Sequence, residues 1–195
     1  MRARLAHEAA RIMAEDGTRD FATAKRKAAE RLAAPETRHL PSNEEIEREL
    51  RQYLNLFHGA ALPTRVAHLR GIALEAMRFL QPFEPRLVGA VLAGVVTEYA
   101  IVELHVSADT PETIGLWLTE HTIPYEQTEK RLRFGGDRYE ALPAFRFTAD
   151  DVTIEVCVFD PRAMREPPLS PVDGKPMRRA DLREVEALTL LSDSV

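Results

Sequence analysis

The spacing of apolar residues along this chain changes once, near Pro85. The fold must therefore combine a helical first part with a strand-rich second part. Before Pro85, apolar residues recur at the three- and four-residue intervals of amphipathic helices. After it, short apolar runs and strict alternation predominate, and both are typical of β-strands. The sequence therefore predicts an N-terminal helical region over residues 1–80 and an α+β domain over residues 81–195.

Four helices are expected in the helical region. The clearest begins at Ser42, because Ser42 and Glu45 have the spacing of a capping box and apolar residues follow at helical intervals. Asp20 is a suitable N-terminal cap for the helix before it. A fourth helix is expected to begin near Thr64 and to end at Pro82, which cannot continue a helix.

The second half is expected to form a mixed, mostly antiparallel sheet of about five strands. The segments with strand patterns are Leu87–Leu92, Ala100–Val106, Ile123–Thr128, Arg131–Phe134, Ala144–Phe147 and Val152–Phe159. Asp150 and Asp151 are expected to form the tight turn between the last two strands. One helix is expected after Thr110, where a cap, a proline and an early acid follow one another, and another from Ala180 to Leu191.

Charge and composition narrow the setting of the protein. The net charge is −5, with 14 basic and 11 acidic residues among the first 80 and 12 basic and 20 acidic residues after them. No apolar run approaches the ~20 residues that cross a bilayer, and no signal peptide is recognisable. Cys157 is a lone cysteine, so no internal disulfide is expected. These features predict a cytoplasmic protein that does not associate with a membrane.

A glycine-containing turn and two glutamates carry the most chemical information. Gly89-Ala90 follows a short apolar run, Gly94 comes shortly after, and Glu103 and Glu155 lie on two later predicted strands. Over roughly residues 85–159 this arrangement resembles the polymerase-beta-like nucleotidyltransferase superfamily. In that family a strand ends in Gly-Gly or Gly-Ser, a second glycine follows, and the next strand carries two carboxylates two residues apart. A third carboxylate comes from a later strand.

The resemblance implies a nucleotidyltransferase-like fold and a degenerate active site. Gly89, Ala90 and Gly94 stand at the positions that would approach nucleotide phosphates, and Glu103 and Glu155 at positions that would hold Mg²⁺. Carboxylates at i and i+2 of a strand share a face and can hold metal ions between them. Ile101 occupies the first carboxylate position, and Ala90 lacks the serine hydroxyl. Two glutamates can hold one Mg²⁺ through waters but make a poor two-metal site.

Two groups of cations are candidates for anion recognition. Lys175 and Arg178 lie in a loop that we expect to be ordered and to pack across the sheet. Their side chains are expected to face an anionic ligand. Alternatively, Arg178 and its neighbour pair with acids of the closing helix. A basic cluster on the second helix either contacts nucleic acid or is a solvated helix face; it comprises Lys25, Arg26, Lys27 and Arg31.

Structural interpretations of the same residues stay open. Gly89 and Gly94 are also expected where chain segments pack closely. Glu103 and His105 are the outward residues expected of a half-exposed strand. Glu155 is expected to be partly buried and therefore to have a partner.

Three functions remain after these considerations. The leading hypothesis is a noncatalytic or weakly active nucleotidyltransferase-like protein that binds a nucleotide or nucleic acid. The alternatives are an active Mg²⁺-dependent nucleotidyltransferase, and an interaction module whose helical region contacts a partner protein or a second copy. Related sequences are expected to carry the name UDP-N-acetylmuramate–alanine ligase, but we do not expect that activity here. Such an ATP-dependent ligase needs a glycine-rich loop ending in Gly-Lys-Ser/Thr, which is absent from this sequence, and about three domains, whereas 195 residues suit one.

Overall fold

The structure is a computed structural model that describes residues 1–34 and 39–192, and the chain forms two compact units. The first unit comprises residues 1–64, 95–100 and 171–174. The second comprises residues 65–94, 101–170 and 175–195. The predicted boundary at residue 80 therefore lies within the second unit.

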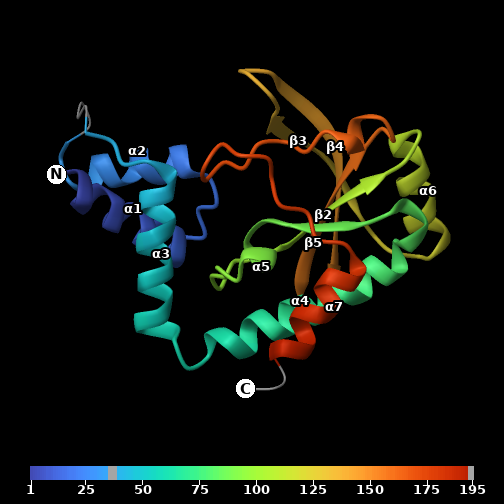
Figure 1. The fold of residues 1–195 in the computed structure, drawn as a ribbon, viewed down its shortest axis with the longest axis horizontal. Helices are drawn as coiled ribbons and strands as arrows, with labels where there is room; N and C mark the ends of the chain where they lie inside the picture. Colours follow the sequence, from blue (N-terminus) through green and yellow to red (C-terminus); the bar gives the residue numbers. More distant parts are fainter. Residues whose placement is uncertain (35–38, 193–195) are drawn as a thin grey trace. The chain divides into compact units, whose positions relative to one another are not determined.

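The first unit contains three helices, α1 (Arg2–Glu15), α2 (Phe21–Arg31) and α3 (Asn43–His58) (Figure 1). The N-terminal caps of α2 and α3 confirm the sequence prediction. The Asp20 carboxylate accepts a hydrogen bond from the backbone N–H of Thr23 at 2.7 Å. Ser42 and Glu45 form both bonds of a capping box. The apolar stripes of the three helices then meet in a core that includes Leu5, Ile12 and Ile46.

The second unit is built on a five-stranded sheet. In chain order its strands are β1 (Arg86–Val88), β2 (Val102–Ser107), β3 (Glu126–Arg133), β4 (Tyr139–Ala149) and β5 (Val152–Phe159). Their order in space is β1-β2-β5-β4-β3. The β2–β5 pair is parallel and the other three pairs are antiparallel. The α+β class and the mixed, mostly antiparallel sheet are thus as predicted.

Helices cover one face of this sheet. They are α4 (Leu62–Phe79), α5 (Gly89–Ala93), α6 (Pro111–Glu120) and α7 (Leu182–Ser192). At Gly115 the backbone of α6 comes close to the Phe145 ring of β4. Figure 1 shows α4 and α7 side by side, and Arg78 of α4 pairs with Glu186 of α7 at 2.9 Å. Among the residues that the structure describes, no helix is both long and apolar enough to span a bilayer.

Three strand predictions need correction. The strand expected over Leu87–Leu92 is wrong beyond Val88, because Gly89 adopts a φ of +72° and turns the chain into α5. A glycine makes this turn at little steric cost. The two segments expected near residues 123–134 form the single strand β3, and β4 begins earlier than predicted, at Tyr139. The turn at Asp150 and Asp151 is confirmed, with positive φ at both residues.

A segment after β5 crosses the other face of the sheet, and we name residues 161–170 and 175–180 the strap. The Leu169 N–H donates to the Arg133 carbonyl of β3 at 2.6 Å, and the Ala180 N–H donates to the Leu87 carbonyl of β1 at 2.9 Å. Since β3 and β1 are the two outer strands, the strap reaches both edges of the sheet. Met164 packs against a buried cluster on this face that includes Cys157 and Phe159.

Candidate functional site

The two glutamates singled out by the sequence lie directly opposite each other. Glu103 of β2 is the register partner of Glu155 of β5 in the parallel pair. Neighbouring strands are about 4.8 Å apart, so the two side chains start close together on one face. Glu155 is buried, with 4% of its side chain exposed, whereas Glu103 is 24% exposed. Two carboxylates at this separation repel each other unless a cation lies between them.

That cation is Lys130 of β3. Its ammonium group donates to Oε1 of Glu103 and to Oε1 of Glu155. Arg146 of β4 donates to the other oxygen of Glu155 through Nε at 2.7 Å, and its Nη2 lies 2.6 Å from the same oxygen in an ion pair. We name these four residues, which carry no net charge together, the ion cluster.

The pKa values of Glu155 and Lys130 favour the charged forms of both groups. Burial raises the pKa of Glu155, but Lys130 and Arg146 outweigh that effect, and the pKa lies below its ordinary value. Burial lowers the pKa of Lys130, but Glu103 and Glu155 outweigh that effect and raise it above its ordinary value. Each charge therefore depends on its partners, and removal of one leaves another uncompensated in a partly buried place.

Gly89 belongs to the same site. A Cβ atom at this position would meet the Glu103 carboxylate, so only glycine leaves room for the acid. The structure thus brings together three of the predicted site residues: Gly89, Glu103 and Glu155. It also gives Gly89 a packing role, because the Glu103 carboxylate fills the space beside the turn.

The ion cluster as arranged does not fit a divalent cation. Lys130 occupies the space between the two carboxylates, and Arg146 takes the remaining oxygen of Glu155. No group of three His, Cys, Asp or Glu side chains suited to a metal occurs within residues 1–34 and 39–192. Mg²⁺ at Glu103 and Glu155 therefore stays a prediction, and it requires Lys130 to leave.

The three glycine-turn residues predicted to approach phosphate, Gly89, Ala90 and Gly94, lie within α5 or at its end. Ala90 lies in its first turn, and Gly94, with a φ of +71°, ends it. Arg70 of α4 donates to the Leu92 carbonyl at 3.1 Å and approaches Gly94. Burial and the nearby Arg178 lower the pKa of Arg70. Arg70, which the sequence did not single out, therefore lies beside Gly94 and within electrostatic reach of Arg178.

The strap residues differ in their surroundings. Lys175 and Arg178 are exposed, and the Lys175 carbonyl accepts a hydrogen bond from the Ser170 N–H at 2.7 Å. The alternative pairing of Arg178 with the closing helix is not found among the described residues. There, Asp181 and Glu184 accept from each other's backbone N–H groups at 2.9 Å.

His105 corrects the expectation that its side of β2 faces solvent. Only 2% of His105 is exposed, because this face is covered rather than open. Burial lowers its pKa to about 3, and the nearby Lys130 and Arg179 add to the effect. Cys157 on the same face is buried, and burial raises its pKa to about 12. Its thiol is therefore not a nucleophile at neutral pH, as the sequence indicated.

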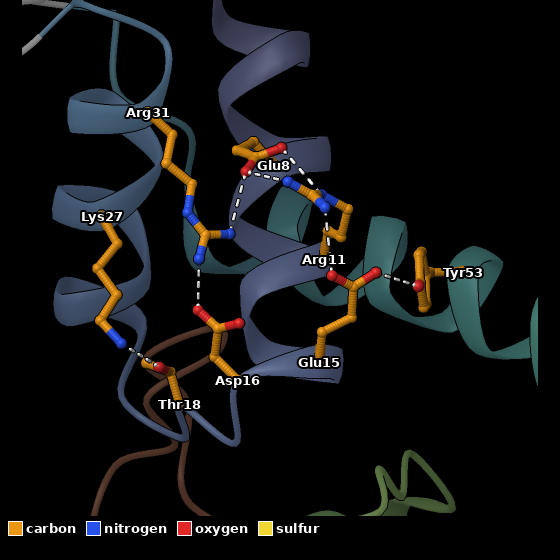
Figure 2. Close-up of polar contacts among 8 residues, drawn as sticks. All are labelled: Glu8, Arg11, Glu15, Asp16, Thr18, Lys27, Arg31 and Tyr53. Carbon is orange, nitrogen blue, oxygen red and sulfur yellow. Dashed lines mark hydrogen bonds and ion pairs between the residues drawn. The ribbon is translucent and has the colours of Figure 1, made fainter.

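The basic cluster of α2 is largely paired within the first unit (Figure 2). Arg31 donates to Asp16 at 2.7 Å and to Glu8 at 3.3 Å. Lys27 donates to the Thr18 hydroxyl at 3.1 Å. Because these cations hold α2 against α1 and the loop after it, this arrangement favours a structural role over a nucleic-acid contact.

Figure 2 also shows how the first and third helices are joined. Arg11 donates to Glu8 and Glu15 on its own helix, at 2.8 and 3.2 Å. The Tyr53 hydroxyl of α3 donates to Glu15 at 2.7 Å. The network links α1 to α2 and to α3, in keeping with a scaffold.

Comparison with protein-family models, with curated proteins and with solved structures finds no significant match to this chain.

Proposed function

We propose that the second unit is a nucleotidyltransferase-like domain that binds a nucleotide without a metal ion and does not transfer the nucleotidyl group. The chain order supports the fold assignment. A glycine turn follows β1, the next strand carries Glu103, and a strand parallel to it carries Glu155. Those are the features on which the family resemblance depends.

The observation that carries the proposal is the position of Lys130. In metal-dependent transfer, cations between the carboxylates and the phosphates neutralise the developing charge. Here Lys130 holds both carboxylates and Arg146 holds the second oxygen of Glu155, so the two cations together already neutralise the two negative charges. The position expected to carry a further carboxylate is Ile101, which has no ligand atom. Binding without transfer follows.

Arg70 and Arg178 supply the positive charge that phosphates require. Neither arginine has a carboxylate partner in the part of the chain that the structure describes. Arg70 is held in place by its bonds to the Val91 and Leu92 carbonyls, at 3.3 and 3.1 Å. Arg178 is exposed and near enough to lower the pKa of Arg70. An anion between the two would relieve their repulsion.

Calorimetric titration with ATP, CTP and UTP, each in Mg²⁺ and in EDTA, tests the proposal. We expect at least one nucleotide to bind with the same affinity in both buffers. Arg178→Gln should weaken that binding about tenfold, since a charge-assisted hydrogen bond contributes about 1.5–3 kcal/mol. Arg162→Gln is the matched control, because Arg162 is an exposed arginine of the strap that takes no part in the proposed site.

Two other outcomes would overturn the proposal. Binding that requires Mg²⁺ and disappears in Glu103→Gln would favour the active transferase. Absence of binding with every nucleotide would favour the interaction module. A transferase assay with radiolabelled nucleotides separates the first outcome from the proposed one, because we expect no transferred label.

A further inference from the structure

A pocket of about 540 Å³ lies near the carboxyl end of β2, in the second unit. Its lining residues come from the start of β1 and the turn before it, from the end of β2 and from the strap: Glu84, Arg86, Ser107, Pro161, Met164, Arg165 and Arg179. The volume is within the range of about 300–1,000 Å³ that is usual for small-molecule sites. Neither the ion cluster nor the Arg70–Arg178 pair contributes to it.

The sheet register separates this pocket from the ion cluster. Ser107 lies four residues beyond Glu103 on the same strand, and alternation puts both side chains on one face. Four residues of a strand span about 13 Å. Arg86 is the register partner of His105, which lies between the two sites. The pocket and the ion cluster are therefore two places on the face that the strap crosses.

Three arginines and one glutamate line the pocket, so its lining is positive. Arg86 has a partial partner in Asp181, at 3.3 Å. Arg179 donates only to the sulfur of Met164, at 3.5 Å. Within the described residues, Arg179 and Arg165 have no carboxylate partner.

A partly buried guanidinium without a carboxylate partner is energetically unfavourable, and Arg179 is such a group. Burial, together with the nearby Arg86, lowers the pKa of Arg179 below its ordinary value. An anion within hydrogen-bond reach of Arg179 would reverse both effects, because it replaces lost hydration and screens the two arginines from each other.

We propose that this arginine pocket binds a phosphomonoester. Guanidinium groups match phosphate oxygens in geometry and charge, and the Ser107 hydroxyl is an additional donor. Pro161 and Met164 form an apolar part of the wall, and the volume exceeds what a phosphate group alone requires. The organic part of the ligand would contact these two residues. The inference uses none of the residues of the proposed nucleotide site and does not depend on that site.

Titration of the full chain with inorganic phosphate and with phenyl phosphate tests the inference. We expect saturable binding of both, with phenyl phosphate tighter because its ring can contact Met164. Arg179→Gln should weaken both at least about tenfold, and Arg165→Gln, at an exposed position, should also weaken both. Arg162→Gln removes the same charge from the same loop outside the pocket, so it should leave both affinities unchanged.

The inference is overturned if neither probe binds saturably, or if Arg162→Gln weakens binding as much as Arg165→Gln. It is also overturned if Arg178→Gln weakens phosphate binding while the two pocket variants do not. The anion would then belong to the proposed nucleotide site. Conversely, ATP affinity that is unchanged in Arg165→Gln, together with weaker phosphate binding, would support two separate sites.

Discussion

Glu103 and Glu155 face each other on two neighbouring parallel strands, and the ammonium group of Lys130 lies between their carboxylates. The lysine comes from β3, an outer strand that pairs with neither β2 nor β5. Its ion pairs therefore connect the outer strand β3 with the inner strands β2 and β5. Under the proposed nucleotidyltransferase-like assignment, metal ions would hold such carboxylates; here a side chain of the protein itself does so.

Loss of the lysine charge should destabilise the fold. In Lys130→Met, the buried Glu155 and its neighbour Glu103 keep their charges and lose the cation between them. We expect the free energy of unfolding to fall by about 2–3 kcal/mol, less than the ~3–5 kcal/mol of breaking a fully buried ion pair, because the lysine side chain is 28% exposed. Urea unfolding monitored by circular dichroism measures the change.

A second substitution separates charge repulsion from lost packing. Glu103→Gln in the Lys130→Met background removes one of the two repelling charges, so it should restore about 1 kcal/mol or more. If the double variant is as unstable as the sum of the two single variants, Lys130 does not act through its charge.

Gly89 and Gly94 offer a matched pair of substitutions. Both have a positive φ, +72° and +71°, so alanine costs about 1 kcal/mol of backbone strain at each. At Gly94 the nearest atom to a new Cβ is a nitrogen of Arg70 at an ordinary 3.6 Å, whereas at Gly89 the Cβ would overlap the Glu103 carboxylate. Moving that carboxylate disturbs the ion cluster.

We therefore expect Gly89→Ala to lower the free energy of unfolding by at least about 1 kcal/mol more than Gly94→Ala does. In a Glu103→Ala background the difference should shrink, because the overlapping group is gone. Equal losses from the two glycine variants in the wild-type background would contradict the contact.

His105 should make the protein less stable in mild acid. Its pKa is lowered from 6.5 to about 3 in the folded state by burial, with Lys130 and Arg179 adding to the effect, and the nearby Glu155 opposing it. Below pH 6.5 the unfolded chain binds a proton that the folded chain does not. The stabilisation is therefore complete above pH 6.5 and is lost as the pH falls toward 3.

The measurement compares unfolding free energies between pH 6.5 and 5, above the ordinary pKa of 4.5 below which the pKa of Glu155 is shifted. The contribution of one such histidine is about 1.1 kcal/mol per pH unit over this range, below the limiting ~1.4, because the histidine of the unfolded chain is only half protonated at pH 6.5. We expect His105→Leu to reduce the slope of stability against pH by about that amount. A slope identical in the two proteins would mean that His105 takes up its proton in the folded state as readily as in the unfolded chain.

The fold was largely predictable because its determinants are local. Asp20, Ser42 and Glu45 act within one turn of their helices, and alternation in β2 and β5 is visible along each strand. The missed element is α5, where an apolar run typical of a buried strand contains Gly89. A glycine that turns a chain and one that packs in a strand look alike in sequence.

The candidate site was predictable only in part because its decisive contacts are long-range. Strand alternation shows which side chains share a face within each strand, but the pairing of Glu103 with Glu155 depends on the register between β2 and β5, which the sequence does not show. Lys130 lies in a strand rich in charged residues, 25 residues from Glu155 and 27 from Glu103, and nothing in the sequence distinguishes it. Arg70 lies on α4, more than 20 residues before the Val91 and Leu92 carbonyls to which it donates, so the sequence did not point to it either.

Binding of Mn²⁺ by wild type and by Lys130→Met tests most directly whether a lysine takes the place of a metal ion. With Lys130 between the carboxylates, Mn²⁺ should not change the melting temperature of the wild type. In Lys130→Met the freed oxygens of Glu103 and Glu155 should bind the ion and raise the melting temperature, and Glu103→Gln in that background should abolish the rise. Saturable Mn²⁺ binding by the wild type that is lost in Glu103→Gln would contradict the account.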